Sequence, residues 1–182
     1  LSANNLNDYP TNLLVSAVSF DENIPSNSTI ATLSTLDQDA SDSYTYLLVP
    51  GDGDTDNSGF TIEDDQLKIV HSPDFESQSS YSIRLQTKDA SGLTFEKKVT
   101  INVTDINEAP TSIKLSTTSF DEDIIPEACI AILSSTDLDV GDDFTYALVS
   151  GAGDTDNNLF MIDGDELKIL NSPNFKSKSS YS

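Results

Sequence analysis

Acidic and amide side chains are gathered in short clusters along the chain, and their oxygen atoms have the chemistry of metal ligands. Between residues 21 and 108 these clusters are Asp21-Glu22, Asp37-Gln38-Asp39, Asp74-Phe75-Glu76, Asp89 and Asp105-Ile106-Asn107-Glu108. Ca²⁺ takes roughly six to eight oxygen ligands from carboxylates, amides and backbone carbonyls. The chain has one His and one Cys, which excludes a zinc site built from imidazole and thiolate ligands. The pattern therefore predicts binding of a hard divalent cation, with Ca²⁺ as the expected ion.

The net charge limits the partners of the chain. The 182 residues include 9 Lys and Arg against 31 Asp and Glu, which gives a net charge of −22. Nucleic acids and anionic membrane surfaces repel such a polyanion, so we expect no nucleic-acid partner. No apolar run approaches the ~20 residues of a membrane helix, and we expect no membrane insertion in this segment. Calcium ions are the expected partner, because they would neutralise the clustered carboxylates.

The chain repeats itself at an offset of 100 residues. Residues 19–82 align with 119–182 without a gap, with 36 identities in 64 positions. Asn7-Asp8-Tyr9-Pro10 likewise corresponds to Asn107-Glu108-Ala109-Pro110. We therefore expect residues 1–9 to be the end of a preceding repeat and its linker, and residues 10–108 to be a complete repeat. Residues 109–182 are expected to be a second repeat, truncated before its last two strands.

Each repeat is expected to be all-β. Short alternating or β-branched runs lie between clusters of Gly, Pro, Asn and Asp, and no segment has sustained helical periodicity. The predicted strands of the first repeat are Leu13–Phe20, Thr29–Leu36, Tyr44–Val49, Phe60–Glu63, Leu67–Val70, Ser79–Lys88 and Leu93–Thr104. Seven short strands in about 100 residues favour a Greek-key β-sandwich. Cys129 lies in the second copy of one such run, where we expect a small buried side chain and no disulfide.

These motifs, in this order, resemble the extracellular cadherin repeat. Glu22 matches its early x-E-x element, Asp37-Gln38-Asp39 its D-x-D, and Asp74-Phe75-Glu76 its D-R-E. Asp89 stands in the later acidic element, and the segment from Asp105 to Pro110 stands in the D-x-N-D-N-x-P linker. The tight repetition is more similar to cadherin-like arrays of large bacterial surface and secreted proteins than to animal classical cadherins. The resemblance implies tandem seven-stranded sandwiches with Ca²⁺ held between successive repeats.

The resemblance also assigns a main ligand set to the junction between the two copies. This set is Glu22, Asp74, Glu76, Asp105, Asn107, Glu108, Asp137 and Asp139. Its seven carboxylates would repel one another, and two or three Ca²⁺ would offset that charge. Glu108 replaces the second Asp of the family linker and Ala109 its last Asn, so the shell of one ion is expected to be incomplete or to use backbone oxygen.

Two further ligand sets are expected to be weaker. The upper junction would use Asn5, Asn7, Asp8, Asp37, Asp39 and Asp89, without the partners that a preceding copy would supply. At the far end of the second copy, Asn174-Phe175-Lys176 replaces Asp74-Phe75-Glu76. Because the Lys176 ammonium repels a cation, this set is expected to be degraded.

The sequence as a whole predicts a non-enzymatic, extracellular segment of a large cell-surface or secreted protein. In this interpretation Ca²⁺ rigidifies a tandem array that serves as an adhesive or structural stalk, and repeats of another chain are its adhesive partners. The alternatives are a module that binds surface polysaccharide through exposed Tyr44 or Tyr46, and an accessory segment of a secreted enzyme. An EF-hand at Asp52–Glu63 is disfavoured, because position six is Asn57 where Gly is required and no flanking helices are predicted.

Overall fold

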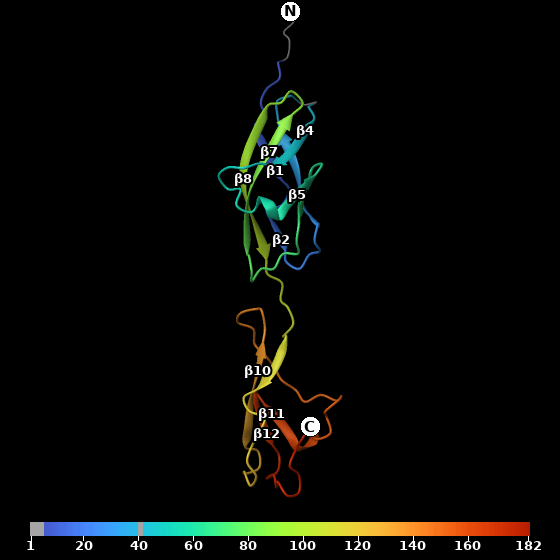
Figure 1. Ribbon diagram of the computed structural model, residues 1–182, viewed down its shortest axis with the longest axis vertical. Helices are drawn as coiled ribbons and strands as arrows, with labels where there is room; N and C mark the ends of the chain where they lie inside the picture. Colours follow the sequence, from blue (N-terminus) through green and yellow to red (C-terminus); the bar gives the residue numbers. More distant parts are fainter. Residues whose placement is uncertain (1–5, 40–41) are drawn as a thin grey trace, which may run out of the picture. The chain divides into compact units, whose positions relative to one another are not determined.

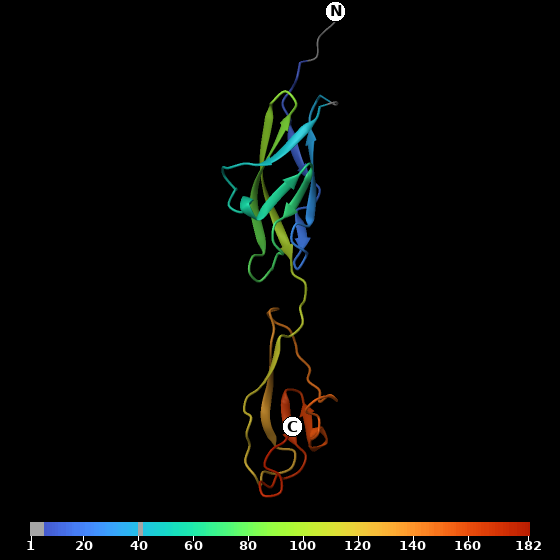
Figure 2. The ribbon, with the colours of Figure 1, turned by 45° about the vertical axis from the view of Figure 1, so that its right-hand side comes forward.

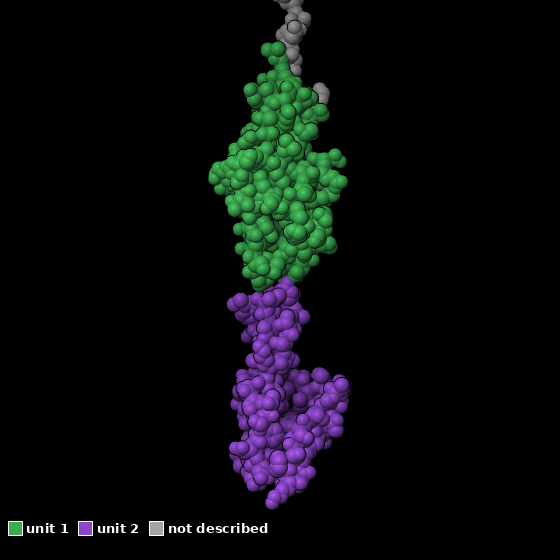
Figure 3. All heavy atoms as spheres, in the orientation of Figure 1, with its two compact units in different colours: residues 1–106 green, residues 107–182 purple. Residues whose placement is uncertain are grey.

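The computed structural model describes residues 6–39 and 42–182. Its internal contacts divide the chain into two compact units, Leu1–Ile106 and Asn107–Ser182, which Figure 3 shows in separate colours. The sequence predicts repeat boundaries after residues 9 and 108, and these boundaries stay predictions, because the division into units does not test them. The two units are described separately below.

The described part of the first unit is a sandwich of two four-stranded sheets (Figures 1 and 2). Its strands are β1 (Asn12–Val15), β2 (Ser19–Asp21), β3 (Thr29–Leu36), β4 (Tyr44–Leu48), β5 (Phe60–Glu63), β6 (Gln66–Ile69), β7 (Ser80–Asp89) and β8 (Thr94–Thr104). One sheet has the order β1-β3-β6-β5 and the other β2-β8-β7-β4. All pairs are antiparallel except β2 with β8, which is parallel.

Alternating side chains fill the space between the two sheets. Along β8, Val99, Ile101 and Val103 are buried, and the residues between them are exposed. This is the pattern expected of a strand with one face on a core and one in water. The buried core consists of Leu13, Ala31, Leu33, Phe60, Leu67, Ile69, Ile83, Leu85, Val99 and Ile101. The core therefore draws on both sheets and depends strongly on the long pair β7–β8.

The prediction of one strand over residues 13–20 is wrong. The run is divided into β1, which pairs with β3, and β2, which pairs with β8 in the opposite sheet. The chain therefore crosses from one sheet to the other over residues 16–18, and the first unit has eight strands in its described part. The other predicted strands agree with the structure to within a residue at either end.

The second unit forms only one of the two sheets. Its strands are β9 (Ser112–Leu115), β10 (Cys129–Thr136), β11 (Phe160–Asp163) and β12 (Glu166–Ile169), in the order β11-β12-β10-β9. This order repeats β5-β6-β3-β1 of the first unit. Within residues 107–182, all of which the structure describes, the segments equivalent to β2 and β4 are not strands, because no partners pair with them.

Helical structure is confined to one short 3₁₀ turn in each unit among the described residues, η1 (Asn57–Gly59) and η2 (Asn157–Leu159). No helix in this described part has the length and apolar character that a membrane span requires. The expectation that Cys129 is buried is wrong: its side chain is exposed at the start of β10. Thr29, the equivalent first residue of β3, is exposed as well, so this end of the strand extends beyond the packed face.

Candidate metal-binding sites

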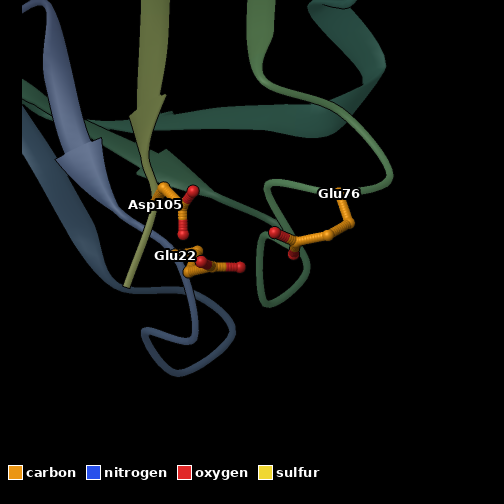
Figure 4. A group of neighbouring side chains, drawn as sticks. All are labelled: Glu22, Glu76 and Asp105. Carbon is orange, nitrogen blue, oxygen red and sulfur yellow. The ribbon is translucent and has the colours of Figure 1, made fainter. Parts of the chain in front are cut away.

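One acidic group lies at the end of the first unit where β2 and β8 finish. Oxygen atoms of Glu22, Glu76 and Asp105 lie within 4.8 Å of one another. Figure 4 shows that the three side chains come from separate segments: Glu22 follows β2, Asp105 follows β8, and Glu76 belongs to the loop after β6. Segments far apart in the sequence therefore bring three carboxylates to one place.

Glu22 holds the other two segments of this group in position. Its side chain is only 3% exposed, and both carboxylate oxygens accept backbone hydrogen bonds. The N–H of Phe75 donates to Oε2 at 2.9 Å, and the N–H of Ile106 donates to Oε1 at 2.8 Å. These donors are the direct neighbours of Glu76 and Asp105 in the chain. A buried carboxylate thus ties together the loop and the strand end that carry the remaining members.

Asp74, which was expected in the same ligand set, lies outside this group of three. Its two oxygens accept hydrogen bonds from the backbone and the hydroxyl of Ser77, at 3.1 and 2.9 Å. The hydroxyl and then the backbone N–H of Ser77 lower the pKa of Asp74 below its ordinary value. In the structure Asp74 therefore serves to close the turn that presents Glu76.

A second acidic group lies at the opposite end of the first unit. Oxygen atoms of Asp37, Asp42 and Asp89 lie within 4.8 Å of one another. Asp37 follows β3, Asp42 precedes β4, and Asp89 ends β7 with only 4% of its surface exposed. Among the described residues, the Oδ2 atoms of Asp37 and Asp42 are shielded from solvent and accept no hydrogen bond. Shielded carboxylate oxygens of this kind are costly unless a donor or a cation compensates them.

The segment that enters the first unit adds polar groups beside this second group. The Asn7 side-chain amide donates to Oδ2 of Asp89 at 2.9 Å, and the backbone N–H of Asp8 donates to Oδ2 of Asp39 at 2.6 Å. The Asp39 N–H in turn donates to Oδ1 of Asp37 at 3.1 Å. Five of the six residues expected at this end are therefore close to it. The sixth, Asn5, lies outside the described residues.

The pKa values reflect crowding of negative charge at this end. Burial first, and then the charges of Asp39, Asp89 and Asp37, raise the pKa of Asp42. Burial alone would also raise the pKa of Asp89, but hydrogen bonds from Asn7 and from the backbone of residues 91–93 outweigh it and lower that pKa. Asp89 is thus the carboxylate held charged, and Asp42 is the one destabilised by its neighbours.

Asp42 was not among the residues predicted from the sequence. It recurs as Asp142 at the repeat offset, three residues after the second Asp of the D-x-D element in both copies. That recurrence was a usable signal, because a purely solvated turn residue is free to change between copies. Position 42 lies between the D-x-D and D-R-E elements of the cadherin pattern and belongs to neither, so the resemblance did not include it.

The start of the second unit repeats this arrangement. The backbone N–H of Glu108 donates to Oδ2 of Asp139 at 2.7 Å, as that of Asp8 does to Asp39. The Asp139 N–H donates to Oδ1 of Asp137 at 3.3 Å, and Oδ2 of Asp137 is shielded without a hydrogen bond among the described residues. Asn107 donates its side-chain amide to the carbonyl of Glu108 at 2.8 Å. The four residues expected from this side of the junction are therefore close together within their own unit.

The far end of the second unit lacks the equivalent of the first acidic group. Glu122 still accepts a hydrogen bond from the N–H of Phe175, at 3.0 Å, as Glu22 does from Phe75. Lys176, however, occupies the position of Glu76 and carries the opposite charge. The local backbone arrangement is thus kept, and the ligand chemistry is changed.

The two tyrosines considered for sugar stacking are not exposed as expected. Tyr44 and Tyr46 are half-buried, and Tyr46 packs against the hydrophobic core. The Tyr46 hydroxyl also accepts a hydrogen bond of 3.2 Å from the hydroxyl of Thr35. Burial between the sheets, which alternation along β4 produces, accounts for the difference.

The first unit is a two-sheet sandwich with acidic loops at its ends, and the second unit repeats one of its sheets. Comparisons with known proteins show that this fold is cadherin-like. The structure is similar to human protocadherin-24 EC1-2, with a TM-score of 0.69 and 19% sequence identity, over 95% of this chain and 82% of that one. It is similar to the human desmocollin-1 ectodomain, with a TM-score of 0.59 and 19% identity, over 93% of this chain and 35% of that one. The expected all-β, cadherin-like fold is confirmed.

Comparison of the sequence with curated proteins also finds similarity to protocadherins. Human protocadherin beta-1 is 29% identical over 133 residues, which are 70% of this chain and 16% of that protein. Human protocadherin gamma-A1 is 35% identical over 81 residues, which are 43% of this chain and 9% of that protein. No protein-family model matches the chain. The chain, which is made of cadherin-like repeats, spans less than a fifth of the length of these curated relatives.

Proposed function

We propose that this chain is a calcium-binding, non-enzymatic segment of an extracellular protein and acts as an adhesive or structural stalk. The proposal is supported by the cadherin-like fold and by the acidic groups at the ends of the units. Repeats of another chain are the adhesive partners that the cadherin resemblance implies. The cell surface is the place where such a segment would meet both its partner and free Ca²⁺.

The observation that carries the proposal is that Asp37 and Asp42 each have a shielded carboxylate oxygen without a hydrogen-bond donor among the described residues. Their Oδ2 atoms are shielded, receive no hydrogen bond within the described part of the chain, and lie in a group with the buried Asp89. Three carboxylates this close raise the free energy of the folded chain unless positive charge is added. Lys and Arg are scarce in this sequence, so a dissolved cation is the available source of that charge.

The donor chemistry fits Ca²⁺ better than the other common metals. The groups consist of carboxylate oxygens, and the side-chain amides of Asn7 and Asn107 lie nearby with the backbone carbonyls of Asp8 and Glu108. Ca²⁺ accepts irregular shells of oxygen ligands, whereas Mg²⁺ requires a near-ideal octahedron and Zn²⁺ favours imidazole or thiolate. When bound, Ca²⁺ supplies charge neutralisation and draws its ligands together.

Hydrogen bonds within the chain orient the acidic loops without a bound ion. Glu22 fixes the segments of Glu76 and Asp105, and the Asp8 and Glu108 N–H groups fix the D-x-D loops. A cation bound to the folded chain adds a stability of RT ln(1 + [Ca²⁺]/Kd). Asp105 lies one residue before the end of the first unit and Glu108 follows three residues later, so ions held at both would restrict the connecting segment. Extracellular modules typically bind Ca²⁺ with a Kd of about 10⁻⁴–10⁻³ M, which would make the stalk rigid outside a cell.

Isothermal titration with CaCl₂, after removal of metals with a chelator, tests this function. We expect saturable binding in the millimolar range or tighter, with more than one ion per chain, and much weaker binding of MgCl₂. The variant Asp37→Asn/Asp42→Asn should lose one class of sites and keep the rest. Asp52→Asn is the matched control, because Asp52 is exposed and its ionic partner in the described part of the chain, Lys98, is 3.8 Å away. Heats no larger than those of buffer dilution would contradict the proposal.

A further inference from the structure

A hollow lies on the side of the first unit where the last strands of the two sheets meet. β4 ends the sheet β2-β8-β7-β4, β5 ends the sheet β1-β3-β6-β5, and the two strands contact each other. The hollow has a volume of about 550 Å³, and we call it the edge hollow. Its lining consists of Tyr44, Thr45, Tyr46, Ile62, Asp64 and Asp65. Aromatic rings combined with a few polar groups, in a hollow of this size, are typical of a small-ligand site.

The two tyrosines contribute their rings to the edge hollow. The Tyr46 hydroxyl accepts a hydrogen bond of 3.2 Å from Thr35 of β3, in the opposite sheet, so it points into the sandwich. Burial, followed by the charges of Asp37 and Asp42, raises the pKa of Tyr44, which places its hydroxyl near that acidic group. Both hydroxyls are thus directed at the protein, and the half-buried rings remain to line the hollow.

Asp64 and Asp65 form the turn that joins β5 to β6. The carbonyl of Asp65 accepts a hydrogen bond of 2.7 Å from the N–H of Leu33 in β3, which holds the turn against the sheet. Asp64 has a φ of 55°, in the left-handed region that favours glycine, and the second copy has Gly164 there with a φ of 63°. The first copy therefore places a carboxylate where the turn itself requires none.

The carboxylates of Asp64 and Asp65 have no partner in the part of the chain that the structure describes. Neither forms a hydrogen bond or an ion pair there, and both residues are exposed. Lys68, in the same hairpin, forms its ion pair with Glu63. Residues 1–106 carry 17 Asp and Glu against five Lys and Arg, a net charge of −12. The edge hollow thus combines aromatic surface with two uncompensated negative charges in a strongly negative unit.

This combination fits an organic cation better than other ligands. An ammonium or guanidinium group can lie against a tyrosine ring and pair with a carboxylate at the same time. Ca²⁺ takes roughly six to eight oxygen ligands, and aromatic rings supply none of them. A neutral sugar would shield the carboxylates from water without compensating their charge, and an anion would be repelled.

We infer that the edge hollow of the first unit binds an ammonium or guanidinium group, which pairs with Asp64 and Asp65 and lies against the rings of Tyr44 and Tyr46. Such groups occur on small polyamines and on the Lys and Arg side chains of polypeptides. The site is separate from Ca²⁺ binding, because its two carboxylates do not belong to the acidic groups at the ends of the unit.

Titration of the ¹⁵N-labelled chain, followed by amide NMR, tests the inference with two cationic probes, N-acetyl-arginine amide and spermidine. We expect saturable shifts in the millimolar range at residues 44–46 and 62–65, with the same Kd in CaCl₂ and in EDTA. N-acetyl-citrulline amide has nearly the shape of the arginine probe without its charge, and it should cause no saturable shift. The tighter of the two cations shows whether a polypeptide side chain or a small amine is the better source of the group.

Variants of the turn test the role of its charges. Asp64→Gly copies the second repeat and suits the backbone, and Asp65→Asn keeps the size of the side chain. Each should weaken binding of the arginine probe about two- to fivefold, because one exposed charge pair is lost. Asp52→Asn is the matched control: it removes the same charge from an exposed residue that does not line the hollow, so binding should be unchanged.

The ring of Tyr44 has its own pair of variants. Tyr44→Phe keeps the ring and copies Phe144 of the second repeat, so binding should be retained. Tyr44→Leu removes the ring but keeps an apolar side chain, and it should weaken binding about two- to fivefold. The amide spectrum of each variant reports at the same time whether the sandwich is folded.

Three results would overturn the inference. They are absence of saturable shifts with both cations, equal binding of the citrulline probe, and shifts centred on Asp37 and Asp89 in place of the edge hollow. The second result would show that the hollow selects a neutral ligand by shape, and the third that the cation adsorbs to the acidic end of the unit.

Discussion

The backbone N–H of Glu108 donates a hydrogen bond of 2.7 Å to Oδ2 of Asp139. The same bond, at 2.6 Å, joins Asp8 to Asp39 in the first unit. In both units, the segment that precedes the first strand is thus fastened to the second Asp of a D-x-D loop. This bond orients carboxylates that would otherwise repel one another, so it holds the acidic loop of each unit in place.

Asp42 is expected to be a Ca²⁺ ligand in the group that it forms with Asp37 and Asp89. The substitution Asp42→Asn should lower Ca²⁺ affinity at that group by roughly tenfold or more, because it removes one charge from the shell. In EDTA the same variant should unfold at a higher temperature than the wild type, since the repulsion by Asp37, Asp39 and Asp89 is relieved. Calorimetric titration and thermal unfolding measure the two effects. A variant that is destabilised in both conditions would contradict the ligand role.

Glu22 is expected to contribute to folding as well as to metal binding. In the variant Glu22→Ala, the N–H groups of Phe75 and Ile106 lose their acceptor. Leaving such donors unsatisfied costs about 1–3 kcal/mol, so the free energy of unfolding of the first unit in EDTA should fall by that order.

The matched control for this variant is Glu122→Ala in the second unit. Glu122 is exposed, and among the described residues its side chain accepts one hydrogen bond, from the N–H of Phe175, so the loss of stability should be smaller. Urea titration followed by circular dichroism gives both values. Equal losses for the two variants would show that the paired hydrogen bonds of Glu22 have no special role.

The second unit provides a natural comparison for the group of Glu22, Glu76 and Asp105, because Lys176 stands at the position of Glu76. Glu76→Lys converts this group to the chemistry of Lys176, and it should abolish Ca²⁺ binding there or weaken it by roughly tenfold or more, because a cation replaces an anionic ligand. The reverse variant Asn174→Asp/Lys176→Glu should increase the number of bound ions. Ion counts by equilibrium dialysis distinguish the two directions, and unchanged counts in both variants would refute the assignment.

Glu96 is expected to make the free energy of unfolding depend on pH even when no metal is bound. A hydrogen bond from Arg84, followed by one from Gln86, lowers the pKa of Glu96 below its ordinary 4.5. Because the pKa is lower in the folded state, the pair contributes stability above about pH 4.5 that is lost as the pH falls further. In EDTA, the difference in unfolding free energy between wild type and Glu96→Gln should therefore shrink below that pH. A difference that stays constant to pH 2.5 would contradict the pairing; the pair is partly exposed, so the expected effect is small.

The sequence was sufficient to predict six of the seven strands expected in the first repeat, and the ends at which carboxylates gather. Alternation identified β8 and the repeat offset identified β10, because both patterns arise from burial of one strand face. Glu22, Glu76 and Asp105 are brought together as the motif order implied, since the ends of neighbouring strands meet at one end of a sandwich.

The remaining features depend on tertiary contacts that local patterns do not encode. The crossing between β1 and β2 is set by which sheet each half pairs with, and the run of residues 13–20 carries no signal for it. Asp74 stays a predicted ligand, and the hydrogen bonds that both of its oxygens accept from Ser77 depend on the fold of the loop. The loss of strand structure at residues 144–148 follows from the absence of a neighbouring strand, although the sequence there is nearly that of β4.

Thermal unfolding of the full chain, in EDTA and in millimolar CaCl₂ at equal ionic strength, tests the central claim most directly. Preferential binding to the folded state at ten times Kd adds about 1.4 kcal/mol, and each kcal/mol raises the midpoint of a domain of this size by about 4–8 °C. We predict a midpoint that rises with CaCl₂ concentration and rises less in the variant Asp37→Asn/Asp42→Asn. Superimposable unfolding curves in CaCl₂ and EDTA would contradict the claim that the acidic ends of these repeats bind calcium.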